Sequence, residues 1–523
     1  MSQPTQAELF ARAFQSQVAR NPGAACLTVP ILRELGVVEA VNAVCSSDHD
    51  VSHGSVVNLL AVNRLQAPRP LYKVGAWLES TALRQALGVQ PEQAHDTRLG
   101  ETLDAVYPHY LTIWQTVIQK AVQRYRLPLV WLHYDITSTY FEGLYTESEF
   151  VKFGYSRDQR PDSKQINLGL NVTGDGLPLA FRVLVGNTAD RTTPRQNCEA
   201  VRALLTEPQR AEATIVHDRA MGTPETLVWY GQHQQRFITP MTADGDLQAL
   251  LDSVPTDELM SHPLHYHPAR AMNTTEPAYY GVWREHAFTH EGHSVHTRVL
   301  VVHSVSKARL DAQKREEALQ KLEKRLAEIQ KHLNQRKYKR RDYTLEQIHL
   351  AQRGNSARHL LNIELTGDDG TLTLQYHVNA EKLALAQARE GRYPLVTNCW
   401  DLDADQVLAR VKEQDVAEKR FAILKGPLQV HPLWLHKDER LVSLVLVVMI
   451  ALLVYCLLEH LVRQAQRRLT GRALMEIFTN YTVVLVSFAD GSQMWAYPEL
   501  APPQSALLND LGLPLPQQTL MLS

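Results

Sequence analysis

One run of 18 uncharged residues, LVSLVLVVMIALLVYCLL from Leu441 to Leu458, constrains the fold of this chain most. A helix that is apolar on every side lies either in a bilayer or at the centre of a large domain. The run reaches only the lower end of membrane-spanning length, and the charged segments KDER and EH flank it. We therefore expect a buried core helix. A membrane-anchored protein is the alternative, which solubility without detergent would exclude.

Composition favours a soluble chain of several domains. The 523 residues suffice for two to four domains, and 44% hydrophobic with 21% charged residues is ordinary for globular proteins. A net charge of -2 means that a polyanionic partner would have to bind local basic patches. The five cysteines are far apart without a CxxC pair, which indicates neither a disulfide framework nor a thiolate zinc site. The start, MSQPTQAELFARAFQSQVAR, lacks the apolar core of a signal peptide, so we expect a cytoplasmic protein.

Hydrophobic periodicity divides the first half of the chain into two domains. Residues 1–125 contain amphipathic runs such as VPILRELGVVEAVNAV and predict an all-α N-terminal domain. Residues 126–241 begin with three β-rich runs, LPLVWLHYDITSTYFEG, KQINLGLNVTG and LPLAFRVLVGN, the last two joined by a GDG turn. A helix, the strand ATIVHD, the helix TPETLVWYGQHQ and the strand RFITPM follow. The order β-β-β-α-β-α-β predicts a mixed α/β core.

Residues 242–398 read as a β-containing insertion in that core. Within it, residues 306–341 predict a coiled helical arm, because apolar residues recur three and four apart, namely Leu319, Leu322, Leu326, Ile329 and Leu333. The arm ends in a basic cluster formed by Arg336, Lys337, Lys339, Arg340 and Arg341. These cations either contact phosphate or form a solvated helix face. Residues 399–480 are expected to complete the core, with the apolar helix, before a tail segment at 481–523.

Three carboxylates suggest a metal site. Asp135 in HYDIT ends the first predicted core strand and Asp218 in VHDRAMG ends the fourth, so we expect the two to converge. Two-metal phosphoryl transfer requires such hard oxygen ligands, because the two ions share a bridging carboxylate and clamp the attacking and leaving oxygens. A late helix, DADQVLARVKEQDVAEKRFAILK, offers a third acid, Glu418, on a stripe that is otherwise largely apolar. Metal coordination would offset the cost of burying it.

The motifs HYDIT, VHDRAMG and AEKRFAILK, with the β-rich interruption before the last, resemble the DDE transposases of bacterial insertion sequences. The resemblance is to the group whose ribonuclease-H-like core is split by an insertion before the glutamate, and it covers most of the chain. It implies a ribonuclease-H-like mixed five-stranded sheet, and Asp135, Asp218 and Glu418 as the catalytic, metal-binding triad. The implied cofactor is Mg²⁺, two ions per active site, for which Mn²⁺ can substitute.

The same resemblance implies how DNA is bound. Related enzymes carry a Tyr, Arg, Glu, Lys signature along the glutamate helix; this sequence keeps Glu418 and Lys425 but has Val411 and Gln414 in the first two places. Gln414 and Lys425 are therefore candidate phosphate contacts, with a surface lysine as the alternative for Lys425. The arm contributes Arg336, Lys337 and Arg340. The implied partners are double-stranded DNA, at terminal inverted repeats and target sites, and a second copy of the chain or a higher assembly; a membrane is not implied.

Several side chains near these motifs have two interpretations. His133 and His217 are expected to be packing residues rather than ligands. Trp283 is either a core residue or a base-stacking residue, and Arg64, Arg69 and Lys73 either contact DNA or are solvated charges.

The implied function is metal-dependent strand cleavage and strand transfer at the ends of an insertion sequence. The alternatives are a catalytically silent DNA-binding relic of the same fold and a simple ribonuclease-H-like nuclease.

Overall fold

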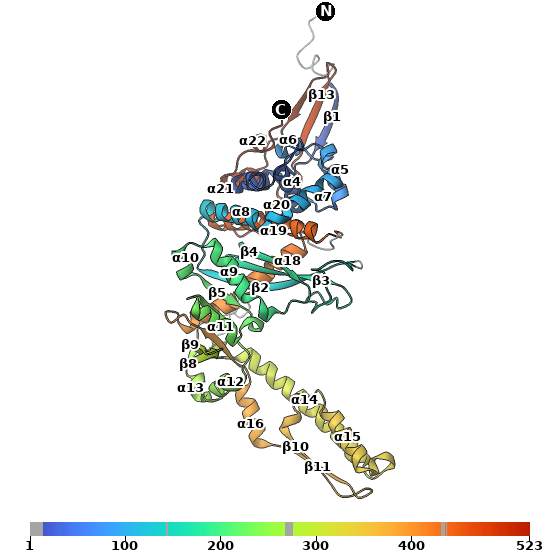
Figure 1. The fold of residues 1–523 in the computed structure, drawn as a ribbon, viewed down its shortest axis with the longest axis vertical. Helices are drawn as coiled ribbons and strands as arrows, with labels where there is room; N and C mark the ends of the chain where they lie inside the picture. Colours follow the sequence, from blue (N-terminus) through green and yellow to red (C-terminus); the bar gives the residue numbers. More distant parts are fainter. Residues whose placement is uncertain (1–13, 143–144, 267–275, 430–434, 436, 523) are drawn as a thin grey trace, which may run out of the picture. The chain divides into compact units, whose positions relative to one another are not determined.

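The computed structural model describes residues 14–142, 145–266, 276–429, 435 and 437–522. The chain forms two compact units (Figure 1): the first contains Met1–Val216 and Glu413–Ser523, and the second contains His217–Lys412. These units divide the chain after Val216 and after Lys412, which are not the boundaries expected from the sequence. The domain boundaries expected from the sequence stay a prediction. Residues 1–13, which belong to the stretch that lacks the apolar core of a signal peptide, lie outside the described residues.

The N-terminal part of the first unit is mainly helical. Its helices are α2 (Ala25–Leu35), α3 (Val37–Asn42), α4 (His53–Gln66), α5 (Val74–Glu79), α6 (Arg84–Leu87), α7 (Asp96–Val106) and α8 (Tyr110–Tyr125). Local chemistry fixes their ends. The Ser52 side chain caps α4 by accepting a hydrogen bond from the Ser55 N–H, and Gly36 ends α2 with a φ of 63°.

The prediction of an all-α N-terminal domain is wrong in one element. Strand β1 (Phe14–Arg20) pairs antiparallel with β13 (Val483–Phe488), and β13 pairs with β14 (Gln493–Ala496). A strand whose partner follows more than 450 residues later leaves no local signal in the sequence. The C-terminal segment also contains α20 (Gly471–Glu476), α21 (Pro502–Leu511) and α22 (Pro516–Leu520).

The long apolar run forms the centre of the first unit. Helix α19 (Asp438–Gln464) contacts α2, α4, α7, α8, α20, α21 and β4. By length and composition this helix could cross a membrane, but its apolar window is entirely buried inside the first unit. The predicted buried core helix is confirmed. Because α19 is apolar on every side, helices from both ends of the chain can pack around it.

Strands β2 (Trp131–Tyr140), β3 (Gln165–Thr173) and β4 (Pro178–Val185) form the predicted antiparallel meander, and Gly176 closes its second turn with a φ of 80°. Two helices follow, α9 (Pro194–Leu204) and α10 (Glu207–Glu212), and then β5 (Thr214–His217). The strand order is β4-β3-β2-β5. A mixed α/β fold is therefore confirmed.

The prediction that Asp135 ends its strand is wrong, because β2 continues in regular register from Asp135 opposite Leu170 to Tyr140 opposite Gln165.

The predicted single helix through residues 403–425 is two helices. Helix α17 (Ala404–Lys412) ends in the second unit, and α18 (Asp415–Lys425) begins in the first. The Gln414 side chain is bonded to β2 rather than arranged along a continuous helix face, so the stripe predicted for the single helix is interrupted there.

The second unit combines antiparallel strands and helices. Its strand order is β6 (Arg236–Pro240), β12 (Arg392–Thr397), β9 (His293–Ser304), β8 (Tyr279–His290) and β7 (Pro263–Leu264). Helices α11 (Pro224–Gln232), α12 (Gly245–Asp252), α13 (Thr256–Met260) and α16 (Ala380–Arg389) accompany them. Thr223 caps α11 before Pro224, as the sequence predicts.

The predicted helical arm has a core of its own. Helix α14 (Val305–His332) packs against α15 (Arg341–Gln352) and the hairpin of β10 (Leu361–Thr366) and β11 (Thr373–Val378), as Figure 1 shows. Four of the five predicted apolar positions are buried in this core, namely Leu319, Leu322, Leu326 and Ile329. The single predicted helix over residues 306–341 ends early, at His332, and a short 3-10 helix follows (Arg336–Lys339).

Candidate functional site

Asp135 lies on a defined face of strand β2. Side chains alternate along a strand, so His133 and Asp135 share one face and Tyr134 lies on the other. The Tyr134 hydroxyl is hydrogen-bonded to Thr193 at the start of α9, whereas the His133 Nδ1 lies 3.1 Å from the Gln414 Oε1 at the start of α18. Asp135 therefore lies on the α18 face of the strands. It is half-buried, and its carboxylate accepts a 2.7 Å hydrogen bond from the Ile136 N–H.

Gln414 attaches the start of α18 to this face. Its amide Nε2 donates to the Tyr134 carbonyl oxygen at 2.7 Å, next to Asp135, and its Oε1 meets the His133 ring. Ala417, Phe421 and Leu424 bury the apolar side of α18, which contacts β2 and β3. Gln414 was predicted to contact DNA phosphate. In the structure its amide is used to hold α18 against β2.

Glu418 follows Gln414 by four residues, one helical turn, and so lies on the same side of α18. The prediction that Glu418 is buried within an apolar face is wrong: its side chain is exposed, because Ala417 and Phe421 take the buried positions instead. Within the first unit, an exposed and a half-buried carboxylate thus occur on two elements that pack against each other.

Lys425 lies two turns after Glu418 on that side of α18 and forms an ion pair. Its Nζ lies 2.5 Å from the Asp158 Oδ1, and the two side chains are 19% and 17% exposed. Asp158 belongs to the segment between β2 and β3, which Asp190 also anchors through Arg157 at 2.5 Å. Lys425, predicted as a phosphate contact with a surface lysine as the alternative, is a half-buried residue that links α18 to this segment.

Asp218 is the first residue after β5 and belongs to the second unit. It is exposed, and its Oδ1 accepts a 2.6 Å hydrogen bond from the Arg219 N–H, which caps a short 3-10 turn. The preceding His217 is fully buried, and its Nδ1 lies 3.1 Å from the Thr239 Oγ1 of β6. Burial lowers the pKa of His217 to about 4, so the ring is neutral at physiological pH. His217 is the packing residue that the sequence predicts.

The donor chemistry suits a hard divalent cation. Asp135, Asp218 and Glu418 offer carboxylate oxygens, the ligands that Mg²⁺ prefers. Across the described residues, the structure has no group of three or more His, Cys, Asp or Glu side chains arranged to hold a metal ion. It brings Asp135 and Glu418 into one unit and has Asp218 in the other.

The other predicted DNA contacts differ in their surroundings. Arg336, Lys337 and Arg340 are exposed at the end of the arm. Arg69 and Lys73 are also exposed, but Arg64 is 9% exposed and donates to the Gln429 carbonyl oxygen, so it does not reach the surface as a DNA contact would.

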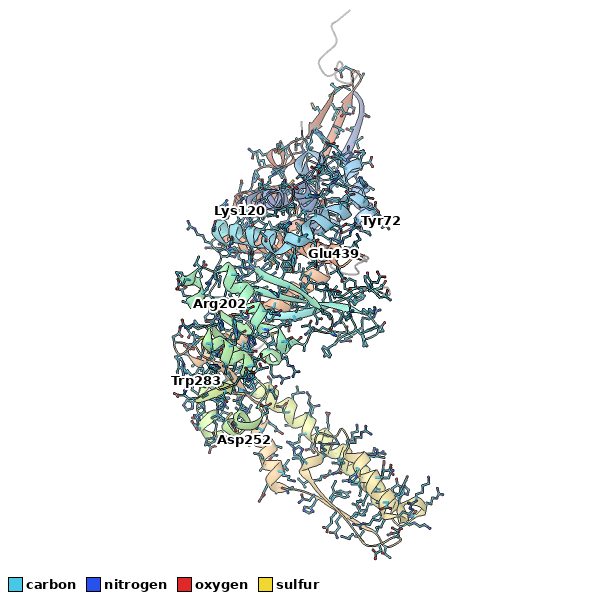
Figure 2. All side chains as sticks on the ribbon, in the orientation of Figure 1. Tyr72, Lys120, Arg202, Asp252, Trp283 and Glu439 are labelled. Carbon is cyan, nitrogen blue, oxygen red and sulfur yellow. The ribbon has the colours of Figure 1, made fainter. Side chains whose placement is uncertain are left out.

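Trp283, labelled in Figure 2, is neither a fully buried core residue nor an open stacking face. It is half-buried, and the Arg298 guanidinium lies 3.8 Å above its ring. That face of the indole is therefore occupied within the second unit.

One ion pair beside the site was missed from the sequence. The Arg420 Nη1 on α18 lies 2.6 Å from the Glu459 Oε2 on α19, with side chains 8% and 10% exposed. The other carboxylate oxygen of Glu459 accepts from the Gly471 N–H at 3.0 Å. This pair fixes the helix that carries Glu418 to the central helix. A Glu next to the apolar run was visible in the sequence, but its partner lies 39 residues away.

Comparison with known proteins gives limited information. Residues 25–118 match a family described as a domain of unknown function, DUF4277. Searching the curated proteins found no match. Among solved structures, the chain is similar to the piggyBac transposase in a synaptic complex with hairpin DNA, at 7% sequence identity and a TM-score of 0.42, over 89% of this chain and 82% of that one.

Proposed function

We propose that this protein is a DDE transposase, which cleaves DNA strands at the ends of an insertion sequence and joins them to target DNA in a metal-dependent reaction. The packing of α18 against β2 is the observation that supports the proposal most. Gln414 bonds to the backbone beside Asp135, and Glu418 follows one turn later on the same side of α18. The sequence resemblance supplies the third ligand, Asp218.

The proposed catalytic residues are Asp135, Asp218 and Glu418, on a ribonuclease-H-like arrangement of β2 to β6. Two Mg²⁺ ions, or Mn²⁺, would activate the attacking oxygen and neutralise charge on the scissile phosphate. The chain's own residues prepare that chemistry. The regular pairing of β2 with β3 fixes the Asp135 backbone, and the Gln414 and Arg420 contacts fix the helix that carries Glu418. An exposed Glu418 remains accessible to a DNA strand.

The proposal includes the partners. Terminal inverted repeats and target DNA are the substrates, and a dimer or higher assembly holds two ends together in the cytoplasm. Lys425 is proposed to contact phosphate after exchanging its Asp158 partner for DNA, and Arg336, Lys337 and Arg340 on the arm add further phosphate contacts.

Cleavage of DNA carrying the flanking ends of the protein's own gene tests the proposal. Purified wild type is compared with Asp135→Asn, Asp218→Asn and Glu418→Gln in Mg²⁺, and binding is measured in the same samples. Glu199→Gln is the matched control, because Glu199 is an exposed acid on α9, on the other face of the strands. We expect the wild type and the control to cut, and the three variants to bind without cutting.

Two outcomes would contradict the proposal. Cutting by all three variants would exclude this triad. Binding of the ends by wild type without cutting, in Mg²⁺ and in Mn²⁺, would favour the silent relic.

A further inference from the structure

A basic cavity lies beside the Glu418 helix, entirely within the first unit. It has a volume of about 870 Å³ and is bordered by α18, by the last turns of α19 and by the segment that follows α19. Five cations line it, Lys419, Arg420, Arg463, Arg467 and Arg468, against one carboxylate, Glu459. Arg420 and Glu459 neutralise each other in their buried pair. Apart from this pair, the charged side chains that line the cavity are therefore all cations.

The acids around the cavity balance these cations only in part. Asp415 pairs with Lys419 at 2.8 Å, and Asp510 pairs with Arg467 at 2.6 Å. Both are partly exposed pairs, of the kind that contributes little and exchanges readily for a phosphate. Arg463 donates to the Asp175 carbonyl oxygen at 3.0 Å, and the carboxylate of Asp175, which lies 3.6 Å from the His460 Nδ1, attracts Arg463 without a direct ion pair. Arg468 is exposed.

The helix dipole does not account for the cluster. A cation in the last turn of a helix is favoured by the C-terminal partial charge, and this explains Arg463. Arg467 and Arg468, however, follow the end of α19 at Gln464, and Lys419 and Arg420 belong to a different helix. Cations from separate elements that border one cavity repel one another, so an anion bound between them gains from all of them.

The cavity is close to the proposed chemistry along α18. Lys419 follows Glu418 directly, and Ala422, one turn after Glu418, lines the cavity. Tyr455 also borders it, but this ring is buried and its hydroxyl accepts a hydrogen bond from the Arg472 N–H. It offers no open face for stacking on a base. The lining therefore suits a sugar-phosphate backbone.

We propose that this cavity binds the phosphodiester backbone of the DNA strand that passes Glu418, with Arg463 and Arg468 as its principal phosphate contacts. The inference rests on the proposed function and adds a binding site to it. It differs from the Lys425 contact, because Lys425 pairs with Asp158 and does not line the cavity.

The test is DNA binding by the full chain as a function of salt. Fluorescence anisotropy with a 40-base-pair duplex, carrying either the gene-flanking end or a scrambled sequence, gives Kd between about 50 and 300 mM NaCl, the range over which phosphate contacts lose most affinity. Wild type is compared with Arg463→Ala, Arg468→Ala and the double variant. Arg472→Ala is the matched control, because this exposed arginine pairs with Glu476 and does not line the cavity.

Each removed phosphate contact should lower the slope of log K against log salt by about one, on both duplexes alike. We expect the double variant to lose about two units of slope and the control to lose none. Arg468→Ala alone carries the test if loss of the Arg463 contact to Asp175 prevents folding. Arg468→Lys should restore most of the slope.

Other outcomes would overturn the inference. An unchanged slope in the double variant would show that the cavity does not hold DNA, even if Asp135→Asn still abolishes cleavage and the proposed function stands. Tripolyphosphate that binds wild type as tightly as DNA, but not the double variant, would assign the cavity to a small polyanion. Failure of wild type to bind any duplex would remove the proposed function together with this site.

Discussion

Two helices of nearly equal length have opposite surroundings. Helix α19 has 27 residues, and an unbroken run from Leu441 to His460 is buried. Helix α14 has 28 residues, and four side chains are buried, all on one stripe. The difference follows from composition, because α19 is apolar on every side and α14 alternates apolar residues with charges. A fully apolar helix organises a whole unit, whereas a striped helix supports only a small local core.

The largest effect should come from the ion pair between Arg420 on α18 and Glu459 on α19. Glu459→Ala leaves the buried Arg420 without its carboxylate, which costs about 3 to 5 kcal/mol of unfolding free energy for such pairs. Urea denaturation of the full chain, followed by far-UV circular dichroism, measures the loss in the first unit. The double variant Arg420→Met with Glu459→Leu should recover most of it, since no charge is then stranded. If the single variant were as stable as wild type, the pair would not hold α18 to α19.

A second pair of substitutions should distinguish the roles of α19 and α14 directly. Ile450→Ala on α19 and Leu326→Ala on α14 each remove a fully buried side chain and should cost about 2 to 5 kcal/mol. We expect Ile450→Ala to lower amide exchange protection throughout the first unit, and Leu326→Ala to lower it only in α14, α15 and the β10–β11 hairpin. Hydrogen exchange mass spectrometry distinguishes these patterns. Arg325→Ala, which removes an exposed pair with Glu328, is the neutral control.

Equal, chain-wide loss of protection in both variants would contradict the comparison, because the arm would then share one cooperative core with the rest of the chain.

The smallest effect concerns pH, and it sharpens the description of the second unit. Burial depresses the pKa of His217 to about 4 from an ordinary value near 6.5. The unfolded chain therefore binds a proton that the folded chain does not, and stability is full above pH 6.5 and falls as the pH drops from 6.5 toward 4. The free energy of unfolding of the second unit should therefore depend less on pH in His217→Gln. Between pH 6.5 and pH 4 its slope should fall by the equivalent of about one bound proton. A slope unchanged by this substitution would assign the acid sensitivity to other groups.

The sequence predicts those parts of the fold whose signal is local. The run at Leu441 identifies α19, the β-rich runs identify β2 to β6, and the Thr223–Pro224 step marks the start of α11. Long-range pairing escapes such reasoning. Strand β1, FQSQVAR, shows no strong alternation, and only its partner β13 makes it a strand. The break before α18 is equally hidden, since it depends on the contact of Gln414 with β2, some 280 residues earlier.

In the candidate site, too, the features with a local sequence signal could be predicted and those that depend on distant contacts could not. The position of Asp218 directly after a short buried strand could be predicted, because the apolar run ATIV ends there. The exposure of Glu418 could not, because a helical stripe does not specify which neighbouring positions turn inward. The use of Lys425 as a tether depends on Asp158, in a segment without regular secondary structure.

The most direct test of the central claim, that Asp135, Asp218 and Glu418 share one metal site, is iron-mediated cleavage of the polypeptide. Fe²⁺ replaces Mg²⁺ on the DNA-bound protein, ascorbate and peroxide generate local radicals, and mass spectrometry identifies the cut positions. The account predicts cuts near residues 135, 218 and 418 together, suppressed by excess Mg²⁺ and lost at all three positions in Asp135→Asn. Cuts near one of these residues alone, or cuts near 218 and 418 that persist in Asp135→Asn, would contradict a shared site.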